Sequence, residues 1–346
     1  MKECIILKGP TVKIVDSPIP EAKRPNDVVI KVVVSGSNPK DWKCAEWMDV
    51  EVNQGDDIAG VVHEVGSDVT EFKKGDRVAA FHEMLAPGGS YAEYAVAHQH
   101  TTFHIPASTT FEAAAATPLA AMTSAVGLYL RLQLPQPWTP ATAPIPLVIY
   151  GAASSVGAYA IQLARRSNIH PLICVAGAST AHVESLIDRG RGDTIVDYRE
   201  GDEAVQAGIR KAVPANTKLL HAFDAVSEHN SYQNLGQVLS VPEGGSTNEK
   251  ARLTLVLPGK VYEGIPAHVE QSTTMVGDVH GDHQDFGHVY FRYLARGLLE
   301  GWFKPQPQEV IPGGLGGVQK GLENLRDGKA RGVKYVFRIA ETEGVN

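Results

Sequence analysis

Short runs of apolar residues separated by glycine turns dominate the first part of the chain. Residues 27–34 form a nearly continuous apolar run, residues 58–66 end at a glycine, and residues 90–96 alternate apolar and polar side chains. Residues 74–80 place a Lys-Gly-Asp turn before a further apolar run. Several short strands with glycine turns are typical of a barrel or sandwich, so we expect a compact, β-rich domain over residues 1–118.

The pattern changes to helices and buried strands from residue 110. Residues 111–116 and 119–132 are rich in alanine and leucine and predict helices, interrupted at Thr117-Pro118. Apolar runs that predict strands then alternate with helical patterns or loops: residues 147–150, 172–176, 194–198, 221–225 and 253–257. This alternation predicts a parallel sheet with right-handed crossovers. A helix from residue 286, a helix over 316–326 and a strand over 333–337 are expected in the tail.

One strand-to-helix corner carries the clearest candidate chemistry. The apolar run 147–150 leads into Gly151-Ala152-Ala153-Ser154-Ser155-Val156-Gly157, after which apolar residues recur at helical spacing. The spacing approximates the dinucleotide-binding pattern G-x-G-x-x-G, although only the third glycine, Gly157, is present. Small side chains let the backbone approach a phosphate at the positive end of a helix, so the corner predicts a pyrophosphate site. An ordinary strand-to-helix turn is the alternative.

Composition and charge narrow the class of protein. At 346 residues, with 43% hydrophobic and 21% charged residues, the chain has the size and composition of a soluble globular protein of two domains. Its net charge of −7 argues against nucleic acid or an anionic membrane as a partner. Three scattered cysteines suit neither a disulfide framework nor a CxxC zinc site, which indicates a reducing compartment. The sequence shows no signal-peptide pattern and no membrane-length apolar run, so we expect a cytoplasmic protein.

Six short motifs, in order along the chain, resemble the medium-chain dehydrogenase/reductase superfamily. They are Asn38-Pro39-Lys40-Asp41, the run 55–62, Val65-Gly66, Gly75-Asp76-Arg77-Val78, Gly89-Ser90-Tyr91-Ala92-Glu93-Tyr94 and the turn 151–157. Within the superfamily the chain resembles the zinc-independent branch of quinone oxidoreductases and enoyl reductases. A proline-rich insertion at 135–146 and the tail segment 328–334 make it most similar to fungal trans-acting enoyl reductases.

The resemblance implies an α/β fold of two domains. A Rossmann domain with a doubly wound parallel sheet would interrupt a GroES-like, β-rich catalytic domain, with the active site in the cleft between them. We therefore expect the catalytic domain over residues 1–118, the Rossmann domain over 119–285 and a return to the catalytic domain over 286–346. The resemblance leaves the oligomeric state open between a monomer and a homodimer.

The resemblance also bears on metal binding. Zinc-dependent members place a cysteine where this chain has Asn38 and a His-Glu pair where it has Asp56-Asp57, so two ligand positions are lost. Catalytic zinc needs three converging ligands and an open position. His63-Glu64 lies farther along the strand, where alternation sends its two side chains to opposite faces. A histidine cluster within 278–288 could in principle chelate a metal, but such clusters are more often solvated. We expect no metal.

In a Rossmann domain, the end of the second strand lies near the adenosine ribose of the cofactor. In this chain, residues 176–182 at that strand end favour NADPH over NADH. An acidic residue there selects NAD by bonding the ribose 2′-hydroxyl. Here residues 176–182 offer no carboxylate, and their small side chains leave room for a 2′-phosphate. The candidate donors are Ser179, Thr180 and His182. The resemblance assigns Tyr198 to the adenosine end, and Arg199 beside it could supply positive charge. We therefore expect NADPH rather than NADH.

Further roles come from the resemblance alone. It implies Lys43 and Thr123 on the nicotinamide side, with Asp41 nearby; Lys43 could donate to the substrate or hold the cofactor, and Thr123 could reach the ribose or carboxamide. Positions that would line the cofactor are Lys40, Ala153, Ser154, Ser155, Val156, Gly157, Ser179, Thr180, His182, Tyr198, Leu257, Pro258, Gly332 and Lys334. Positions that would line the substrate channel are Met122, Ser124, Leu128, Met275, Val276, Gly277 and His280. A solvated surface lysine and a helix N-terminal threonine are the alternatives for Lys43 and Thr123.

The expected chemistry is delivery of a hydride to an electrophilic carbon. Without zinc to polarise a plain carbonyl, the natural electrophile is an α,β-unsaturated carbonyl or a quinone, and the enolate that forms needs hydrogen-bond donors. We expect an enoyl reductase for a thioester-tethered, polyketide-type chain, with a polyketide synthase as partner. A reductase of small quinones or enones is the alternative enzyme, and a non-catalytic NADPH-binding protein is the alternative of another class. Tyr91 and Tyr94 are candidate proton donors in principle, but the family's strand positions imply that they pack, so bulk water is the expected donor.

Overall fold

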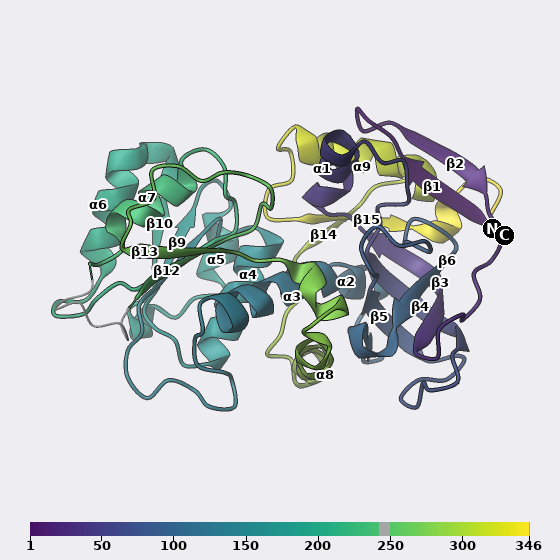
Figure 1. The fold of residues 1–346 in the computed structure, drawn as a ribbon, viewed down its shortest axis with the longest axis horizontal. Helices are drawn as coiled ribbons and strands as arrows, with labels where there is room; N and C mark the ends of the chain where they lie inside the picture. The colour runs from purple at the N-terminus through teal and green to yellow at the C-terminus, as the bar shows by residue number, and fades with distance from the viewer. Residues whose placement is uncertain (242–249, 346) are drawn as a thin grey trace. The chain divides into compact units, whose positions relative to one another are not determined.

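The computed structural model describes residues 1–241 and 250–345, and it divides into two compact units (Figure 1). The first unit comprises Met1–Met122 and Gly277–Asn346, and the second comprises Thr123–Val276. The division into domains predicted from the sequence, at residues 118 and 285, stays a prediction. Among the described residues, no helix combines the length and the apolar character needed to cross a membrane.

Strand β3 (Asp27–Gly36) organises the main sheet of the first unit. The sheet has the order β14-β15-β3-β4-β5-β7, and β6 also pairs with β3. Along one edge β3 pairs with β4, and along the other its residues 27–31 pair with β6 and its residues 34–36 with β15. Two register shifts in the β3–β4 ladder bend the strand, so one strand can serve three partners.

The remaining strands of the first unit are β1 (Lys2–Ile6), β2 (Val12–Asp16), β4 (Asp57–Val65), β5 (Arg77–Phe81), β6 (Tyr94–His98), β7 (Thr102–His104), β14 (Gln308–Val310) and β15 (Lys334–Arg338). Its helices are α1 (Pro39–Met48), α2 (Phe111–Ala115), α8 (Gln284–Glu300) and α9 (Val318–Arg326), while α3 (Pro118–Ala125) continues into the second unit. Short 3₁₀ turns are η1 (Gln99–Thr101), η6 (Val276–His280), η7 (Gly314–Gly317) and η8 (Ile339–Glu341). Alternate residues of β3, such as Val28 and Ile30, share a core with Leu322 of α9 and Phe337 of β15.

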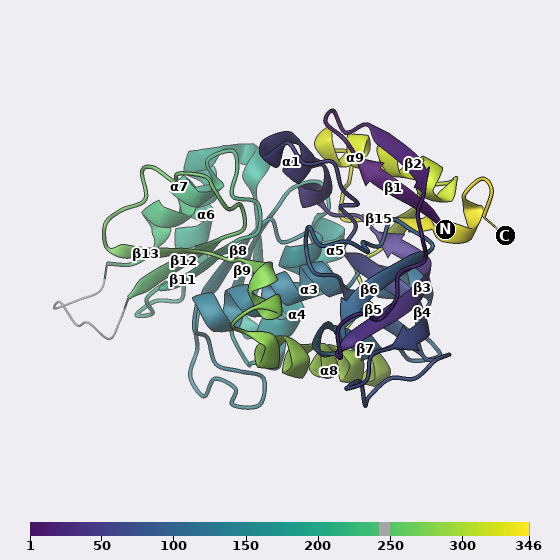
Figure 2. The ribbon, with the colours of Figure 1, turned by 45° about the vertical axis from the view of Figure 1, so that its right-hand side comes forward.

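The second unit is built on a six-stranded, entirely parallel sheet. Its order is β10-β9-β8-β11-β12-β13, and Figure 2 shows β11, β12 and β13 side by side. The strands are β8 (Leu147–Tyr150), β9 (Leu172–Ala176), β10 (Thr194–Asp197), β11 (His221–Asp224), β12 (Ala251–Leu255) and β13 (Val269–Thr273). The order reverses direction at β8, and ligands of such sheets bind at the carboxyl ends of the strands beside that point.

Helices cover this sheet, because its central strands are apolar on both faces. They are η2 (Val126–Arg131, a π-helical turn), α4 (Ser155–Arg166), α5 (Thr180–Glu184), α6 (Asp202–Ala212) and α7 (Ser231–Val238), with 3₁₀ turns η3 (Arg189–Arg191) and η4 (Tyr198–Glu200). Val205 of α6 and Leu235 of α7 share a core with Ala222 of β11. The neighbouring Phe223 meets Gly127 of η2, so η2 covers the opposite face.

The predicted fold class is confirmed: a doubly wound parallel sheet is joined to a β-rich, GroES-like unit. The boundaries differ in places. Pro118 begins α3, because proline suits the first turn of a helix. The strand predicted at 253–257 spans Ala251–Leu255, and the alternating run at 90–96 pairs as a strand only from Tyr94. The polar strand β13 is an element that apolar patterning did not predict.

Candidate active-site residues in the two units

Helix α1 begins at the Asn-Pro-Lys-Asp motif, and residues of that motif stabilise its first turn by a hydrogen bond to one another. Asn38 precedes the helix in an extended conformation, and Pro39 occupies the first helical position, where its missing N–H costs nothing. The Asn38 N–H donates to Asp41 Oδ2 at 2.7 Å, which closes the turn. The next turn carries Lys43, so the anchoring of Asp41 also fixes where the Lys43 backbone lies.

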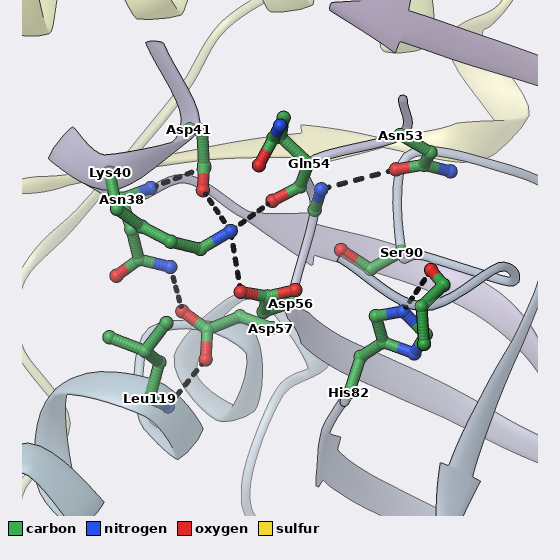
Figure 3. Close-up of polar contacts among 12 residues, drawn as sticks. Asn38, Lys40, Asp41, Asn53, Gln54, Asp56, Asp57, His82, Ser90 and Leu119 are labelled. Atoms are coloured by element: carbon green, nitrogen blue, oxygen red, sulfur yellow. Dashed lines mark hydrogen bonds and ion pairs between the residues drawn. The ribbon is translucent and has the colours of Figure 1, made fainter. Parts of the chain in front are cut away.

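Lys40 projects from this turn into a buried cluster of polar groups (Figure 3). Its ammonium donates to the main-chain oxygen of Gln54 at 2.6 Å and lies 3.1 Å from Asp41 Oδ1 and 2.5 Å from Asp56 Oδ2. The hydroxyl of Tyr91 donates to Asp41 Oδ2 at 2.6 Å. Asp41, Asp56 and Tyr91 are fully buried. The predicted cofactor residue Lys40 and the predicted catalytic residue Asp41 are therefore paired with each other.

Burial and charge act in opposite directions on this cluster. Burial raises the pKa of Asp41 and of Asp56 to about 6, although the Lys40 ammonium favours their ionised forms. Burial acts against the charge of Lys40, but the carboxylates of Asp56 and Asp41 outweigh it and raise the Lys40 pKa. Burial and the charge of Asp41 raise the pKa of Tyr91 well above its usual value. Lys40 therefore stays charged, and the two buried carboxyls keep their protons to a higher pH than exposed carboxyls do.

A second ion pair lies beside the first and joins distant parts of the chain. The Lys334 ammonium, from the start of β15, lies 2.5 Å from Asp57 Oδ2 and donates to Asn38 Oδ1 at 2.8 Å. Asp57 also accepts from Asn38 Nδ2 at 2.8 Å and from the N–H of Leu119, in the first turn of α3, at 2.6 Å. Asn38 and Asp57 occupy two of the positions considered above for a metal, and here they bind an ammonium group. Lys334 itself was predicted to line the cofactor.

Lys43 and the residues predicted on α3 are also mostly buried. Lys43 is 7% exposed, and its Nζ lies 5.6 Å from the ring centre of Trp42 and 5.5 Å from that of Trp47. On α3, Met122 is fully buried and Thr123 is 6% exposed. Ser124 is buried too, and its hydroxyl donates to the main-chain oxygen of Val156 at 2.7 Å. In the second unit the structure thus brings a predicted substrate residue against a predicted cofactor residue.

The predicted phosphate corner has the geometry of an anion cradle. Gly151 turns the chain after β8 with a φ of 75°, and Ser154 caps α4, its hydroxyl accepting the N–H of Gly157 at 3.0 Å. A Cβ at Gly157 would lie 2.3 Å from the Gly151 oxygen, so this position accepts only glycine. Ala153, Ser154, Ser155 and Val156 are half-buried, which leaves the positive end of a twelve-residue helix open to a ligand.

The neighbouring strand ends carry the other predicted cofactor residues of the second unit. Ser179 and Thr180 begin α5 just after β9, followed by His182 in the same helix, and all three are half-buried. The Tyr198 ring lies against Gly177, where a Cβ would be 2.7 Å from it. Arg199 is bonded to Asp197 through two guanidinium nitrogens, at 2.5 and 2.9 Å. Leu257, whose oxygen accepts the Tyr262 hydroxyl, and Pro258 follow β12.

The remaining predicted residues are scattered. Leu128 is buried in η2 and Met275 is 41% exposed. Val276 and Gly277 begin η6, where the chain passes from the second unit back to the first. Gly332 has a φ of 68° just before β15. His280 packs its ring 4.7 Å from Phe81 and also contacts His98 and His100. Burial and these two histidines lower the pKa of His280 to about 3. Within residues 1–241 and 250–345 no group of three His, Cys, Asp or Glu side chains is arranged to hold a metal.

Some members of the buried cluster were not predicted as site residues. Asp56 and Asp57 were noted only as replacements for metal ligands. Tyr91 was considered as a proton donor and then expected to pack, and Gln54 was not considered. Two adjacent aspartates in an otherwise apolar run were the available signal, because buried carboxylates require partners. The sequence did not indicate that Lys40 and Lys334 would be those partners.

Comparison with known proteins places the chain in a class. Residues 24–107 match the alcohol dehydrogenase GroES-like domain family. The mycobacterial Rv1454c complexed with NADPH superposes with a TM-score of 0.73 at 17% identity, over 97% of this chain and 99% of that one. This likeness shows the fold that the sequence motifs predicted, a GroES-like domain joined to a doubly wound parallel sheet.

Two curated relatives define the family more closely. Trans-enoyl reductase fsr4 of Gibberella fujikuroi is 51% identical over 90% of this chain and 91% of its own length. Trans-enoyl reductase resD of Aspergillus sclerotiorum is 32% identical over 94% of this chain and 96% of its own length. The chain therefore belongs to the trans-enoyl reductase family, which confirms the resemblance stated from the sequence.

Proposed function

We propose that this protein is a zinc-independent, NADPH-dependent enoyl reductase. Its reaction would reduce a C=C bond conjugated to the carbonyl of a thioester-tethered, polyketide-type chain in secondary metabolism. The observation that carries the proposal is the 51% identity to a protein named trans-enoyl reductase, which extends over nine-tenths of both chains. The same name suggests a substrate presented by a separate polyketide synthase.

The residues of the second unit fit a nicotinamide dinucleotide. Gly157 and Ala152 are too close together for a larger side chain, and a half-buried helix start lies beside them, as a pyrophosphate requires. Ser154, Ser155 and Val156 would hold the pyrophosphate, and Tyr198 would lie at the adenosine. When bound, the nicotinamide supplies a hydride to the carbon β to the thioester carbonyl.

The choice of NADPH rests on charge at the strand ends. The half-buried segment after β9 carries hydroxyls and no carboxylate up to His182. Asp197, at the end of the next strand, is neutralised by Arg199, whose guanidinium holds the pKa of Asp197 at about 2. Arg199 is half exposed and can turn toward a 2′-phosphate, which supports NADPH over NADH.

The protein's own contribution is to stabilise charge on the substrate oxygen. Addition of hydride at the β carbon leaves an enolate, and an ammonium donor lowers the energy of that oxygen anion. Lys43 is our candidate donor, with Thr123 orienting the cofactor, and a proton from water completes the product at the α carbon. Lys334 occupies the place between Asn38 and Asp57, and its positive charge repels a metal cation there, which supports a reaction without zinc.

The test uses purified protein, NADPH and the crotonyl thioester of N-acetylcysteamine. We expect loss of reduced-nicotinamide absorbance together with the butyryl thioester as product, and slower turnover with NADH. Lys43→Ala should lower kcat by roughly 10²–10³-fold, the usual cost of removing an oxyanion donor, whereas the exposed Lys320→Ala should change nothing. Turnover of p-benzoquinone alone would instead show a quinone reductase, and NADPH binding without turnover of either would show a non-catalytic binding protein.

A further inference from the structure

The last turn of α1 exposes a large indole to solvent. Trp47 is 57% exposed, so most of its surface gains nothing from burial. It follows Lys43 by four residues, which places both side chains on one face of the helix. The Lys43 ammonium lies 5.5 Å from the centre of the Trp47 ring, within the range of a cation–π contact.

A second indole lies at a similar distance from the same ammonium. The Trp42 ring centre is 5.6 Å from Lys43 Nζ, and Trp42 is half-buried against the core of the first unit. Two aromatic rings therefore lie near the ammonium of a lysine that is only 7% exposed. Trp42 is fixed by the core, whereas Trp47 forms the outer wall.

Aromatic walls suit an ammonium that must stay charged and stay in place. A lysine side chain has four flexible carbons, and it loses its orientation unless something confines it. An indole face attracts the cation while adding no negative charge that would compete for its hydrogen bonds.

We propose that Trp47 is a positioning residue that holds the Lys43 ammonium where it can donate to the substrate. The proposal rests on the donor role given to Lys43 above. It explains why a tryptophan lies on an exposed helix end, and it predicts that the aromatic face matters rather than the volume of the side chain. Loss of Trp47 should slow the chemical step more than it weakens binding of substrate or NADPH.

Three variants separate a positioning role from a structural one. With NADPH and the crotonyl thioester, Trp47→Leu should lower kcat roughly tenfold, because small misplacements of a catalytic group cost up to about 10²-fold, with little change in either KM. Trp47→Phe keeps an aromatic face and should restore most of the rate. Trp138→Leu, at a tryptophan of similar exposure (53%) in the second unit, is the matched control and should behave as the parent protein.

A spectroscopic measurement reports the contact itself. Reductive methylation with ¹³C-formaldehyde labels the lysines and keeps their charge, and the Lys43 signal is assigned from its absence in Lys43→Arg. The ring currents of the two indoles should shift this signal upfield, and Trp47→Leu should move it toward the position of exposed lysines. Trp138→Leu should leave it in place.

The outcomes distinguish this inference from the function on which it rests. A slow Trp47→Leu enzyme with a displaced Lys43 signal and rescue by phenylalanine supports it. If Lys43→Ala abolishes turnover but Trp47→Leu is as fast as Trp138→Leu, the inference is wrong and the donor role stands. If Lys43→Ala turns over normally, the donor role is wrong and Trp47 has no catalytic group to position.

Discussion

The two units hold their candidate functional groups by different physical means. In the first unit, charged side chains meet inside the protein: Lys40 lies between Asp41 and Asp56, and Lys334 binds Asp57. In the second, the strand ends around the 151–157 corner present backbone groups and small side chains, most of them half-buried. Buried charges are costly unless every partner is present, whereas a helix end offers its positive dipole without any charged residue. The first unit should therefore depend far more on single residues and on pH.

The largest effect is expected at Lys334. Replacing it by methionine would leave the fully buried Asp57 carboxylate without its ammonium partner, and breaking such a pair costs about 3–5 kcal/mol. The free energy of unfolding, measured by urea denaturation, should fall by that amount. The additional change Asp57→Asn removes the unpaired charge and should recover part of the loss.

An exposed ion pair in the same unit provides the control. Lys329 pairs with Asp327 at 3.0 Å, but both side chains are substantially exposed. Lys329→Met should therefore leave the free energy of unfolding nearly unchanged, because exposed ion pairs contribute little to stability. A Lys334→Met protein no less stable than Lys329→Met would show that the buried pair does not anchor β15 to the start of α1.

A second effect concerns how the stability of the first unit depends on pH. His280 and the carboxyls of Asp41 and Asp56 change the free energy of unfolding in opposite directions as pH changes. The pKa of His280 falls from 6.5 to about 3, so the unfolded chain binds more protons between these values and stability decreases as pH falls through them. The pKa of Asp41 and of Asp56 rises from 3.8 to about 6, so in that narrower range the folded chain binds more protons and stability decreases as pH rises.

Replacing one histidine should make the opposing contribution of the carboxyls visible. His280→Phe keeps the ring contact with Phe81 and removes the group that resists protonation. The free energy of unfolding of the variant minus that of the parent should be more positive at pH 4 than at pH 7, by about 3 kcal/mol. Urea denaturation at both pH values measures this difference. A parallel pH profile for variant and parent would mean that His280 is protonated in the folded protein.

The same contrast decides what could be predicted from the sequence. The corner of the second unit is formed by consecutive residues, so the apolar run, the small residues and Gly157 appear together in the chain and predict the geometry directly. The cluster of the first unit joins Lys334 to Asp57 across 277 residues of sequence. No local sequence pattern predicts that pairing. Lys40 and Lys334 were both expected to line a cofactor rather than to bind aspartates.

Residues assigned by resemblance were predicted in part: their positions follow from the resemblance, but their contacts do not. Lys43 and Asp41 were assigned from the resemblance. The side chains beside them, the indoles at Lys43 and Tyr91 and Lys40 at Asp41, are not specified by it. Strand β13 was missed for a related reason. Its residues 270–273 are polar, and only its pairing with β12 makes it part of the sheet.

The smallest effect is expected at the cap of α4, and it tests whether the second unit really depends on backbone rather than side chains. Ser154 satisfies one N–H of the first turn, so Ser154→Ala should cost about 1 kcal/mol of stability and weaken NADPH binding only a few-fold. Ser155→Ala, one residue further along and without the capping bond, should leave stability unchanged. Urea denaturation and titration of NADPH fluorescence measure both quantities. Loss of NADPH binding in Ser154→Ala at unchanged stability would show that the hydroxyl itself holds the phosphate, and the two units would then be less different than their structures indicate.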